Sequence, residues 1–421
     1  MSDNIIETAI ERGLFDDAPW ALFIDIDRLQ HRFALLNDAF PADTLHAVAV
    51  KANPLVSLLR QLVDQGAGLE AASFGEIEVA RLAGADDHRI VYDSPAKTVE
   101  ELQRALHAGI YINADNLSEL QRIDGLNPPE DARVGIRINP VIGAGDIEAT
   151  SVATKASKFG VSITRNRRAL LEAFRRYDWL RGLHVHTGSQ GLELDALVEG
   201  VKRCIDFADD IDADPAAAPV ETIDIGGGLP VAYHPHDETP GVDQYATALR
   251  DEIPHLFSGP RNLITEFGRW LFAPCGLAVS RVEYVKESPA GPIATIHFGA
   301  DLLLRTAYRP DDWYHRVTIH DGDGRRRSGD ETQLTIAGPL CFSGDLVARR
   351  RPLPRPQPGD FAAVHDTGGY TFSMWSRYCS RAFPRVFGVR KTAAEALTFQ
   401  PLHPGESAPD LARFWAGQRE G

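Results

Sequence analysis

The chain has 421 residues, of which 43% are hydrophobic and 24% are charged, and these proportions are typical of a globular protein of one or two domains. Its net charge of −15 argues against nucleic acid and anionic membranes as partners. No apolar run approaches the roughly 18 residues of a membrane-spanning helix, and the acidic amino terminus does not resemble a signal peptide. The four cysteines have no metal-binding spacing and are too sparse for a disulfide scaffold, so we expect a cytoplasmic protein with reduced thiols.

Short apolar runs alternate with longer amphipathic ones between about residue 20 and residue 275. The apolar runs predict strands at 21–26, 46–50, 69–73, 90–92, 111–114, 134–139, 182–186, 222–225 and 263–266. Helical patterns lie between many of them, for example at 54–65, 74–83, 98–108 and 194–211. This alternation predicts a (β/α)8 TIM barrel or a doubly wound sheet. The barrel is favoured, because polar or glycine-rich segments recur just after the strands, where barrel enzymes carry their chemistry.

The pattern changes after residue 275. Turns rich in Gly, Asp and Pro separate predicted strands at 277–285, 293–297, 317–321, 333–337 and 361–365. The segment 348–359 contains four Arg and four Pro, which predicts an exposed loop. We therefore expect three parts: an amino-terminal segment (1–25) that packs with the last domain, a barrel (26–275) and an all-β carboxy-terminal domain (276–421).

Two motifs at strand ends suggest chemistry. Lys51 follows an apolar strand and precedes Ala-Asn-Pro, so it is either a solvated lysine, the reading favoured for this residue alone, or a Schiff-base lysine with a depressed pKa. Gly226–Gly228 also follows an apolar strand, and its bare N–H groups are suited to a phosphate. The loop lacks the spacing of nucleotide-binding motifs, and a plain tight turn explains it equally well.

Two further motifs complete a pattern. Glu266 and Arg269 follow another strand, either as a buried ion pair or as an acid for a protonated ring nitrogen beside a phosphate-binding arginine. His184 and His186 point the same way from a strand, but no third metal ligand is adjacent, and stacking of an imidazole on an aromatic ring is an equal alternative. A lysine amine, a glycine loop, an acid and a histidine together are what pyridoxal phosphate requires.

As a set, these motifs resemble those of the fold-type III pyridoxal-phosphate enzymes, and within them the diaminopimelate/ornithine/arginine decarboxylase group. The resemblance covers most of the chain, in order, at Ala49–Pro54, Leu69–Glu76, Ile136–Pro140, Ser157–Gly160, His186–Gln190, Gly226–Gly228, Glu266–Arg269, Gly338–Asp345 and Asp366–Tyr370. It implies an alanine racemase-like TIM barrel followed by an all-β domain, with pyridoxal 5'-phosphate as the cofactor. The implied activity is that of an amino-acid decarboxylase, a carboxy-lyase.

The resemblance also implies residue roles. Lys51 would bond to the cofactor, His186 would stack on its ring, and Cys341 would protonate the decarboxylated carbon. The implied cofactor contacts besides Lys51 and His186 are Ser189, Gly227, Gly228, Glu266, Gly268, Arg269 and Tyr370. Glu266 would hold the pyridine nitrogen, whereas Gly268, Arg269 and Tyr370 would contact the phosphate. The implied assembly is a homodimer with shared active sites, in which Cys341 comes from the second subunit.

The departures from the family concern the substrate, for which Arg305, Tyr308 and Phe342 are the candidate contacts. Phe342 stands where the family commonly has an acid that meets a distal amine, and an aromatic ring offers only cation–π contact or core packing. Phe267 replaces a proline of the family. Arg305 matches a carboxylate-binding arginine of diaminopimelate decarboxylases, but Tyr308 comes one residue early. We expect a diamino acid or an amino-acid conjugate as substrate, and we hypothesise a role in siderophore or other secondary metabolism.

Two alternatives remain open alongside decarboxylation. A racemase on the same barrel usually lacks an acid at the pyridine nitrogen, so Glu266 favours the decarboxylase. A cofactor-binding or regulatory protein that lost catalysis is disfavoured by the presence of Cys341 and Tyr370, whereas a catalytically inactive paralogue that serves only as a dimer partner stays open. In chemical terms, a protonated pyridine ring accepts the electron pair left by CO2, and a cysteine over the α-carbon can supply the one proton then needed. The exact substrate and the configuration at its reacting carbon stay open.

Overall fold

The computed structural model describes residues 2–143, 153–154 and 156–418. These residues form two compact units. One unit consists of His31–Val231 and Glu238–Leu271, and the other of the described residues up to Gln30, Ala232–Asp237 and those from Phe272 onward. The three parts predicted from the sequence, with limits at 25/26 and 275/276, stay a prediction.

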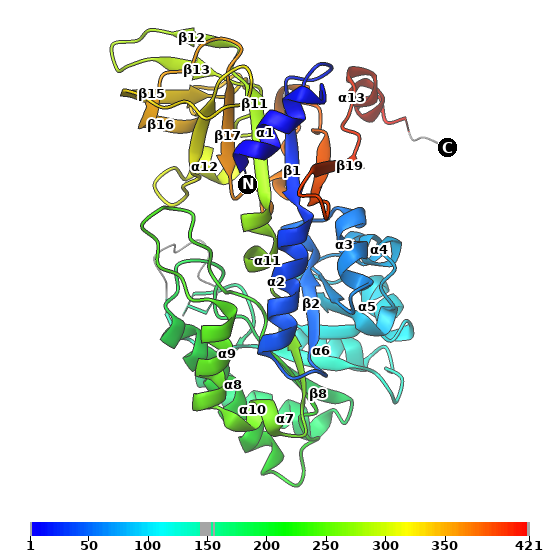
Figure 1. The fold of residues 1–421 in the computed structure, drawn as a ribbon. Helices are drawn as coiled ribbons and strands as arrows, with labels where there is room; N and C mark the ends of the chain where they lie inside the picture. The colour runs from blue at the N-terminus through cyan, green and yellow to red at the C-terminus, as the bar shows by residue number, and fades with distance from the viewer. Residues whose placement is uncertain (1, 144–152, 155, 419–421) are drawn as a thin grey trace. The chain divides into compact units, whose positions relative to one another are not determined.

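The first unit is a closed barrel of parallel strands, which confirms the predicted fold class (Figure 1). In spatial order its strands are β5 (Tyr111–Ala114), β4 (Ile90–Asp93), β3 (Gly68–Ala71), β2 (Leu45–Ala49), β10 (Asn262–Thr265), β9 (Thr222–Asp224), β8 (Leu180–Val185) and β6 (Val134–Asn139). The pairing of β5 with β6 closes the ring, and the short β7 (Val161–Ser162) pairs in parallel with the carboxyl end of β6. The carboxyl ends of all these strands therefore meet at one rim, where barrel enzymes build their sites.

Helices surround the barrel, as expected from the amphipathic patterns. They are α2 (Ile26–Ala39), α3 (Val56–Val63), α4 (Phe74–Leu82), α5 (Val99–His107), α6 (Leu117–Asp124), α7 (Ile163–Arg176), α8 (Leu194–Asp212), α9 (Val242–Glu252), α10 (Pro254–Ser258) and α11 (Arg269–Phe272). Figure 1 shows α3, α4 and α5 on the outside of the strands. Ser73, Thr98 and Asn116 cap α4, α5 and α6 by accepting backbone N–H groups, so they determine where these helices start after their strands.

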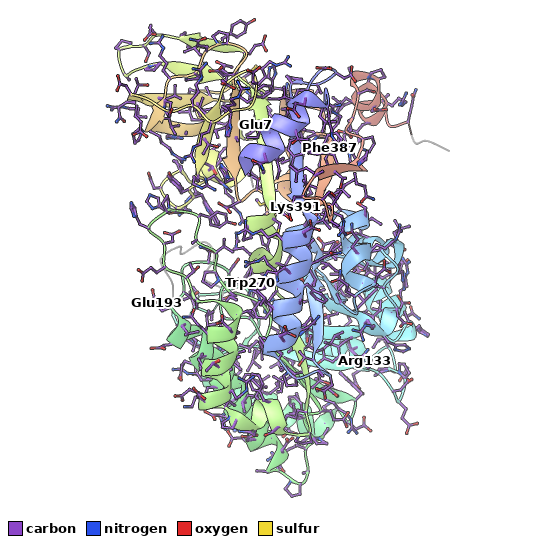
Figure 2. The ribbon with its side chains drawn as sticks, in the orientation of Figure 1. Glu7, Arg133, Glu193, Trp270, Phe387 and Lys391 are labelled. Atoms are coloured by element: carbon purple, nitrogen blue, oxygen red, sulfur yellow. The ribbon has the colours of Figure 1, made fainter. Side chains whose placement is uncertain are left out.

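The second unit contains two sheets. A six-stranded sheet has the order β14 (Val317–His320), β17 (Phe361–His365), β11 (Gly276–Arg281), β1 (Trp20–Asp25), β18 (Val386–Lys391) and β19 (Leu397–His403). A four-stranded sheet has the order β12 (Tyr284–Lys286), β13 (Ile293–Thr295), β15 (Glu331–Ala337) and β16 (Leu346–Pro354). The helices α1 (Ser2–Glu11), α12 (Leu304–Tyr308) and α13 (Ala408–Trp415) belong to the same unit. Phe387, labelled in Figure 2, stacks on Phe23 of β1 with ring centroids 5.8 Å apart.

The second unit corrects several sequence-based expectations. The predicted strand 277–285 is broken into β11 and β12. The predicted loop 348–359 is wrong for its first half, because β16 runs to Pro354. Among the described strands β16 pairs only with β15, so it lies at the edge of its sheet. Proline is tolerated there, because its missing N–H can face away from the neighbouring strand. The strands β18 and β19 were not predicted, and β1 lies in this sheet rather than in the barrel.

Candidate active site

The interior of the barrel holds a cluster of buried polar side chains near the carboxyl ends of its strands. They are Glu70 on β3, Asp93 on β4, Asn113 on β5, Arg137 on β6, His184 on β8, Asp224 on β9 and Glu266 just after β10. Of these, the sequence singled out only His184 and Glu266. The sequence did contain a signal for the others, namely a charged residue within an apolar strand. If such a residue faced the helices, it would be buried without a partner. Such residues must therefore face the barrel interior, where they meet one another.

Lys51 lies at the rim of the barrel, in the short turn Val50–Ala52 that follows β2. Its Nζ donates to Oε2 of Glu70 at 2.5 Å. The lysine side chain is 35% exposed, whereas Glu70 is completely buried. Burial raises the pKa of Glu70 to about 7, although the charge of Lys51 opposes this rise. An amine that is to act as a nucleophile must lose a proton, and Glu70 offers an acceptor with a suitable pKa.

His184 lies between two carboxylates. Its Nδ1 is 3.1 Å from Oδ2 of Asp224, and its Nε2 is 3.5 Å from Oδ2 of Asp93. Burial disfavours the charged imidazole, but the negative charges of Asp224 and Asp93 raise the pKa of His184 well above its usual value. Asp93 also accepts from Nη1 of Arg137 at 2.9 Å. Burial raises the pKa of Asp93, but Arg137 and His184 outweigh this effect and hold that pKa well below its usual value.

Glu266 is the acid of this cluster that lacks a hydrogen-bond partner. Both of its carboxyl oxygens are buried and neither forms a hydrogen bond within the described residues. In charge terms, Lys51 faces Glu70, Arg137 faces Asp93, and His184 faces Asp224, which leaves no cation of the group for Glu266. Accordingly, burial and the negative charge of Asp224 raise the pKa of Glu266 well above its usual value. Burial and Asp224 therefore favour the protonated form of Glu266.

Asp93, His184 and Glu266 also resemble a metal site, because each offers one ligand atom and these atoms lie within 4.8 Å of one another. Asp93 is already bound to Arg137, and His184 is held by Asp224. These contacts explain the arrangement as a charge network, so we assign no metal to it.

His186 follows the end of β8 and lies next to Glu266, with 3.8 Å between Nδ1 and Oε2. Its Nδ1 accepts the backbone N–H of Gly227 at 3.2 Å, so the ring proton is on Nε2. Burial and the positive charges of Arg137 and Lys51 lower the pKa of His186 well below its usual value. The ring is therefore neutral, which suits a side chain that stacks on a flat ligand rather than one that binds an anion.

The glycine loop is shaped by close backbone approaches. Gly226 and Gly228 have φ values of +66° and +101°, which other residues rarely adopt. A Cβ on Gly227 would lie 2.6 Å from the carbonyl oxygen of Glu266, so the loop is pressed against the strand end that carries this acid. A Cβ on Gly268 would lie 2.8 Å from that of Ala52, in the turn that holds Lys51.

Arg269 and Ser189 are bound to each other. Nε of Arg269 donates to the backbone oxygen of Ser189, and its Nη2 donates to Oγ of Ser189, both at 3.0 Å. Arg269 is buried. The structure thus brings the predicted barrel residues to one rim: Lys51, His186, Ser189, Gly227, Gly228, Glu266, Gly268 and Arg269.

The remaining predicted site residues lie in the second unit. The guanidinium of Arg305, on α12, lies over the rings of Trp313 and Tyr370, at 4.6 and 4.9 Å from their centroids. The ring of Tyr308 stacks on that of Phe342 with 5.6 Å between centroids. Cys341, next to Phe342, is exposed. Within this unit Arg305 therefore packs against aromatic rings, and Tyr308 packs against Phe342.

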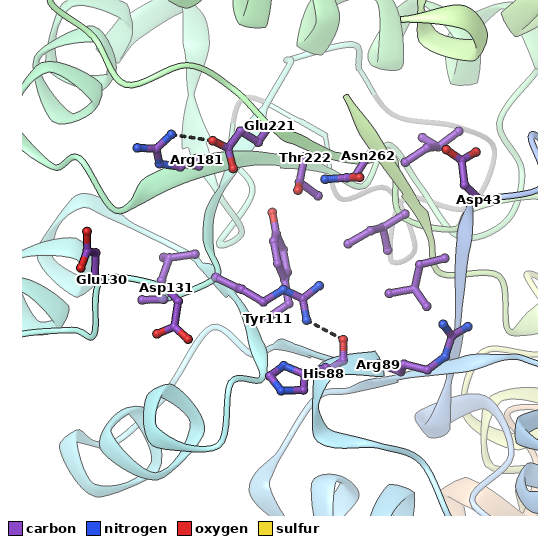
Figure 3. A pocket seen from close by; sticks show the side chains of 16 residues that line it. Asp43, His88, Arg89, Tyr111, Glu130, Asp131, Arg181, Glu221, Thr222 and Asn262 are labelled. Atoms are coloured by element: carbon purple, nitrogen blue, oxygen red, sulfur yellow. Dashed lines mark hydrogen bonds and ion pairs between the residues drawn. The ribbon is translucent and has the colours of Figure 1, made fainter. Parts of the chain in front are cut away.

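A pocket of about 590 Å³ lies at the opposite end of the barrel from Lys51 (Figure 3). It is lined by the amino ends of the strands, including Leu45, Tyr111 and Thr222. Arg133 crosses it and donates to the backbone oxygen of His88. Because barrel chemistry resides at the carboxyl ends of the strands, we do not assign this pocket to the active site.

The donor set at the rim fits pyridoxal phosphate on several independent features. A lysine amine lies beside a proton acceptor, a protonated acid has no hydrogen-bond partner, and a neutral imidazole adjoins that acid. A strained glycine loop and a buried arginine bound to a serine are suited to the phosphate. Fold and site together therefore define a barrel enzyme whose rim residues suit this cofactor.

Comparison with known proteins agrees with this class. Residues 26–273 match the family described as "Pyridoxal-dependent decarboxylase, pyridoxal binding domain", and the chain belongs to this family. The chain is 32% identical over 401 residues to a diaminopimelate decarboxylase of Methanothermobacter thermautotrophicus, covering 92% of this chain and 91% of the relative. It is 31% identical over 363 residues to that of Campylobacter jejuni, covering 85% and 87%. The crystal structure of the Helicobacter pylori diaminopimelate decarboxylase complexed with L-lysine superposes with a TM-score of 0.84 at 26% identity, covering 97% and 99%.

The protein is therefore a pyridoxal phosphate-dependent carboxy-lyase that acts on an amino acid. When bound, the cofactor supplies an electron sink for the pair that remains on the α-carbon after CO2 leaves. Among the described residues, no helix is both long and apolar enough to cross a membrane.

Proposed function

We propose that the chain decarboxylates diaminopimelate, or a closely related diamino acid, with lysine as the product in the first case. The relatives named above support this substrate, as does the L-lysine in the Helicobacter pylori complex. Arg305 supports it too, since a guanidinium is suited to a distal carboxylate. The hypothesis of a siderophore or other secondary-metabolite substrate finds no support in the comparisons, and we do not retain it.

The observation that carries the choice of decarboxylation is the state of Glu266. The pKa of this buried acid is raised well above its usual value, and neither of its oxygens has a hydrogen-bond partner among the described residues, so it can keep a ring nitrogen protonated. A protonated ring withdraws electrons strongly, as the loss of CO2 requires. A racemase gains from a weaker electron sink, and the comparisons favour neither a racemase nor an inactive paralogue.

The proposed roles of the other side chains follow from their contacts. Lys51 binds the cofactor and passes its proton to Glu70. His186 stacks on the ring in its neutral form. Ser189, Gly227, Gly228, Gly268 and Arg269 would hold the phosphate, and the resemblance assigns Tyr370 the same role. Cys341 returns one proton to the α-carbon, and Tyr308 and Phe342 line the distal part of the substrate site.

We further propose that the protein is a cytoplasmic homodimer with shared active sites. All four cysteines are free thiols, which is typical of a reducing compartment. Cys341 is exposed on its own unit, as a residue that completes a neighbouring subunit's site must be.

The substrate is tested by mass spectrometry in D2O. The cofactor-loaded protein is incubated with diaminopimelate, ornithine, lysine, arginine and carboxylated diamine conjugates, each as L and D forms where these exist. We expect diaminopimelate to yield a product that has lost CO2 and carries one deuterium. Deuterium at the α-carbon with the carboxylate retained would identify a racemase instead. Turnover of another amino acid without diaminopimelate would refute the proposed substrate.

The shared site is tested by mixing two inactive variants. Lys51→Ala lacks the cofactor lysine and should lose the absorbance band of lysine-bound cofactor, whereas Cys341→Ala lacks the proton donor. In a mixed dimer, one site has an intact lysine and an intact cysteine. Mixing should therefore restore part of the activity, and no recovery would contradict a site built from two chains.

A further inference from the structure

Two cysteines of the second unit meet at its surface. Cys341 and Cys379 are both exposed, and Cys379 lies in the short turn Tyr378–Ser380. Cys379 is the neighbour that most raises the pKa of the Cys341 thiol, as expected of two adjacent thiols. The flanking residues hold the two segments together: Oη of Tyr378 donates to the backbone oxygen of Cys341 at 3.5 Å, and the rings of Tyr378 and Phe342 meet edge to face at 6.4 Å. Tyr378, the residue before Cys379, therefore joins the segment of Cys379 to that of Cys341.

The turn that carries Cys379 has an uncommon backbone conformation. Cys379 and Ser380 have φ values of +57° and +52°, a region that non-glycine residues seldom adopt unless surrounding contacts hold them there. The other two cysteines, Cys204 and Cys275, are buried. Only the Cys341–Cys379 pair therefore offers two adjacent thiols to a reagent in solvent.

We propose that Cys341 and Cys379 form an oxidative modification site, in which hydrogen peroxide converts the two thiols into a disulfide and reversibly stops decarboxylation. The inhibitory effect rests on the proposed role of Cys341 as the proton donor, since a disulfide sulfur has no proton to give. The formation of the disulfide itself rests only on the proximity and exposure of the two thiols.

The reaction balances with peroxide as the only oxidant. One thiolate of the pair attacks a peroxide oxygen, the O–O bond breaks, and a sulfenic acid and one water result. The second thiolate attacks the sulfenic sulfur, the S–O bond breaks, and the S–S bond forms with release of a second water. Two thiols lose two electrons and two protons in total, and peroxide is reduced to two waters. A dithiol reductant reverses the change by thiol–disulfide exchange.

The ordinary pKa of a cysteine thiol, 9.0, is already high enough to keep Cys341 protonated in the reduced enzyme, and Cys379 only raises it further. Hydrogen bonding to Cys379 and the negative charge that Cys379 would carry when ionised raise the pKa of the Cys341 thiol. At neutral pH the thiol is protonated, as a proton donor must be. Because the thiolate is the species that attacks peroxide, we expect the oxidation to accelerate as the pH rises.

The experiment treats the cofactor-loaded enzyme with hydrogen peroxide, blocks the remaining thiols with iodoacetamide and maps tryptic peptides without reduction. We expect a peptide containing Cys341 linked to one containing Cys379, within a chain that stays monomeric on a non-reducing denaturing gel. Decarboxylation should fall by about 100-fold or more, the contribution typical of a general acid. Dithiothreitol should restore it.

The variant Cys379→Ser provides the matched control. It keeps Cys341, so its activity before peroxide should equal that of the wild type, and circular dichroism checks that it is folded. Peroxide should then inactivate it in a way that dithiothreitol does not reverse, because Cys341 proceeds to the sulfinic acid without a resolving thiol. No linked peptide in the wild type, or full recovery of the variant, would overturn the proposed site. A linked peptide with activity retained would overturn the inhibition and the proton-donor role of Cys341 alone.

Discussion

Glu266 and Asp224 are neighbouring buried acids of the barrel. Because the charges around them differ, replacing each by the amide of the same shape should change the free energy of unfolding by very different amounts. The raised pKa of Glu266 favours its neutral form, and neither of its carboxyl oxygens has a hydrogen-bond partner among the described residues, so we expect Glu266→Gln to replace one neutral group by another. We expect it to change the free energy of unfolding by no more than about 1 kcal/mol. Asp224 accepts from Asn113 at 2.8 Å and from Gly226 at 2.9 Å, and it faces His184 at 3.1 Å.

Asp224→Asn is therefore the control for stability. It removes the partner of a buried imidazolium, and breaking such a pair typically costs about 3–5 kcal/mol. Urea unfolding of both variants at neutral pH measures this contrast. If Glu266→Gln destabilised the protein as much as Asp224→Asn does, our assignment of the proton to Glu266 would be wrong.

The effect of Glu266→Gln on activity should be large despite the small effect on stability. An amide cannot hold the proton of a ring nitrogen, so one charge-assisted hydrogen bond worth about 1.5–3 kcal/mol is lost. At about 1.36 kcal/mol for each factor of ten, CO2 release should slow by about 10- to 150-fold. A stable variant with wild-type CO2 release would refute the role that we assign to this acid.

Two other changes test the rim of the barrel. Gly228→Ala places a Cβ against the carbonyl oxygen of Gly188, at a backbone φ of +101°. A cofactor titration should therefore show weaker binding, and thermal unfolding should show a loss of stability of about 1–3 kcal/mol. The control Gly84→Ala, at a φ of +93° with open space around it, should leave cofactor binding unchanged. Folding raises the pKa of Glu70 from 4.5 to about 7, so its contribution to stability is complete below about pH 4.5 and is lost as the pH rises through about 7. As the pH rises through this range, the free energy of unfolding of cofactor-free Glu70→Gln should increase relative to that of the wild type by up to about 3 kcal/mol. Urea unfolding measures this difference, and a difference that does not change with pH would contradict the raised pKa.

The barrel could be predicted because its strands are short apolar runs of regular spacing. Lys51, the glycine loop and Glu266 could be found because each follows such a run. The acids that surround these residues were missed because Glu70, Asp93 and Asp224 lie within the strands. Residues at such positions are usually interpreted as structural. Only the closure of the barrel brings these acids to the lysine and the histidine.

Some matched motif residues have structural roles that the structure makes clear. Ser73 accepts the backbone N–H of Glu76 at 3.2 Å, and the Glu76 carboxylate accepts that of Ala72 at 2.7 Å, so the two residues fix the start of α4. Phe159 covers the guanidinium of Arg137 at 4.6 Å. The edge strand β16 was missed because its prolines argue against a strand when only the local sequence is considered. That it lies at the edge of its sheet, where proline is tolerated, is a property of the tertiary fold.

The position of β1 has a consequence for how the chain acquires its structure. This strand lies inside the six-stranded sheet, antiparallel to β11 and parallel to β18, both of which are encoded far downstream. During synthesis β1 leaves the ribosome early, and its partners emerge only after the whole barrel. Pairings of such large sequence separation form slowly. A fragment that begins after the barrel would contain β11 and β18 without the strand between them, and two open edges would invite aggregation. The two ends of the chain must therefore be expressed together for the sheet to form.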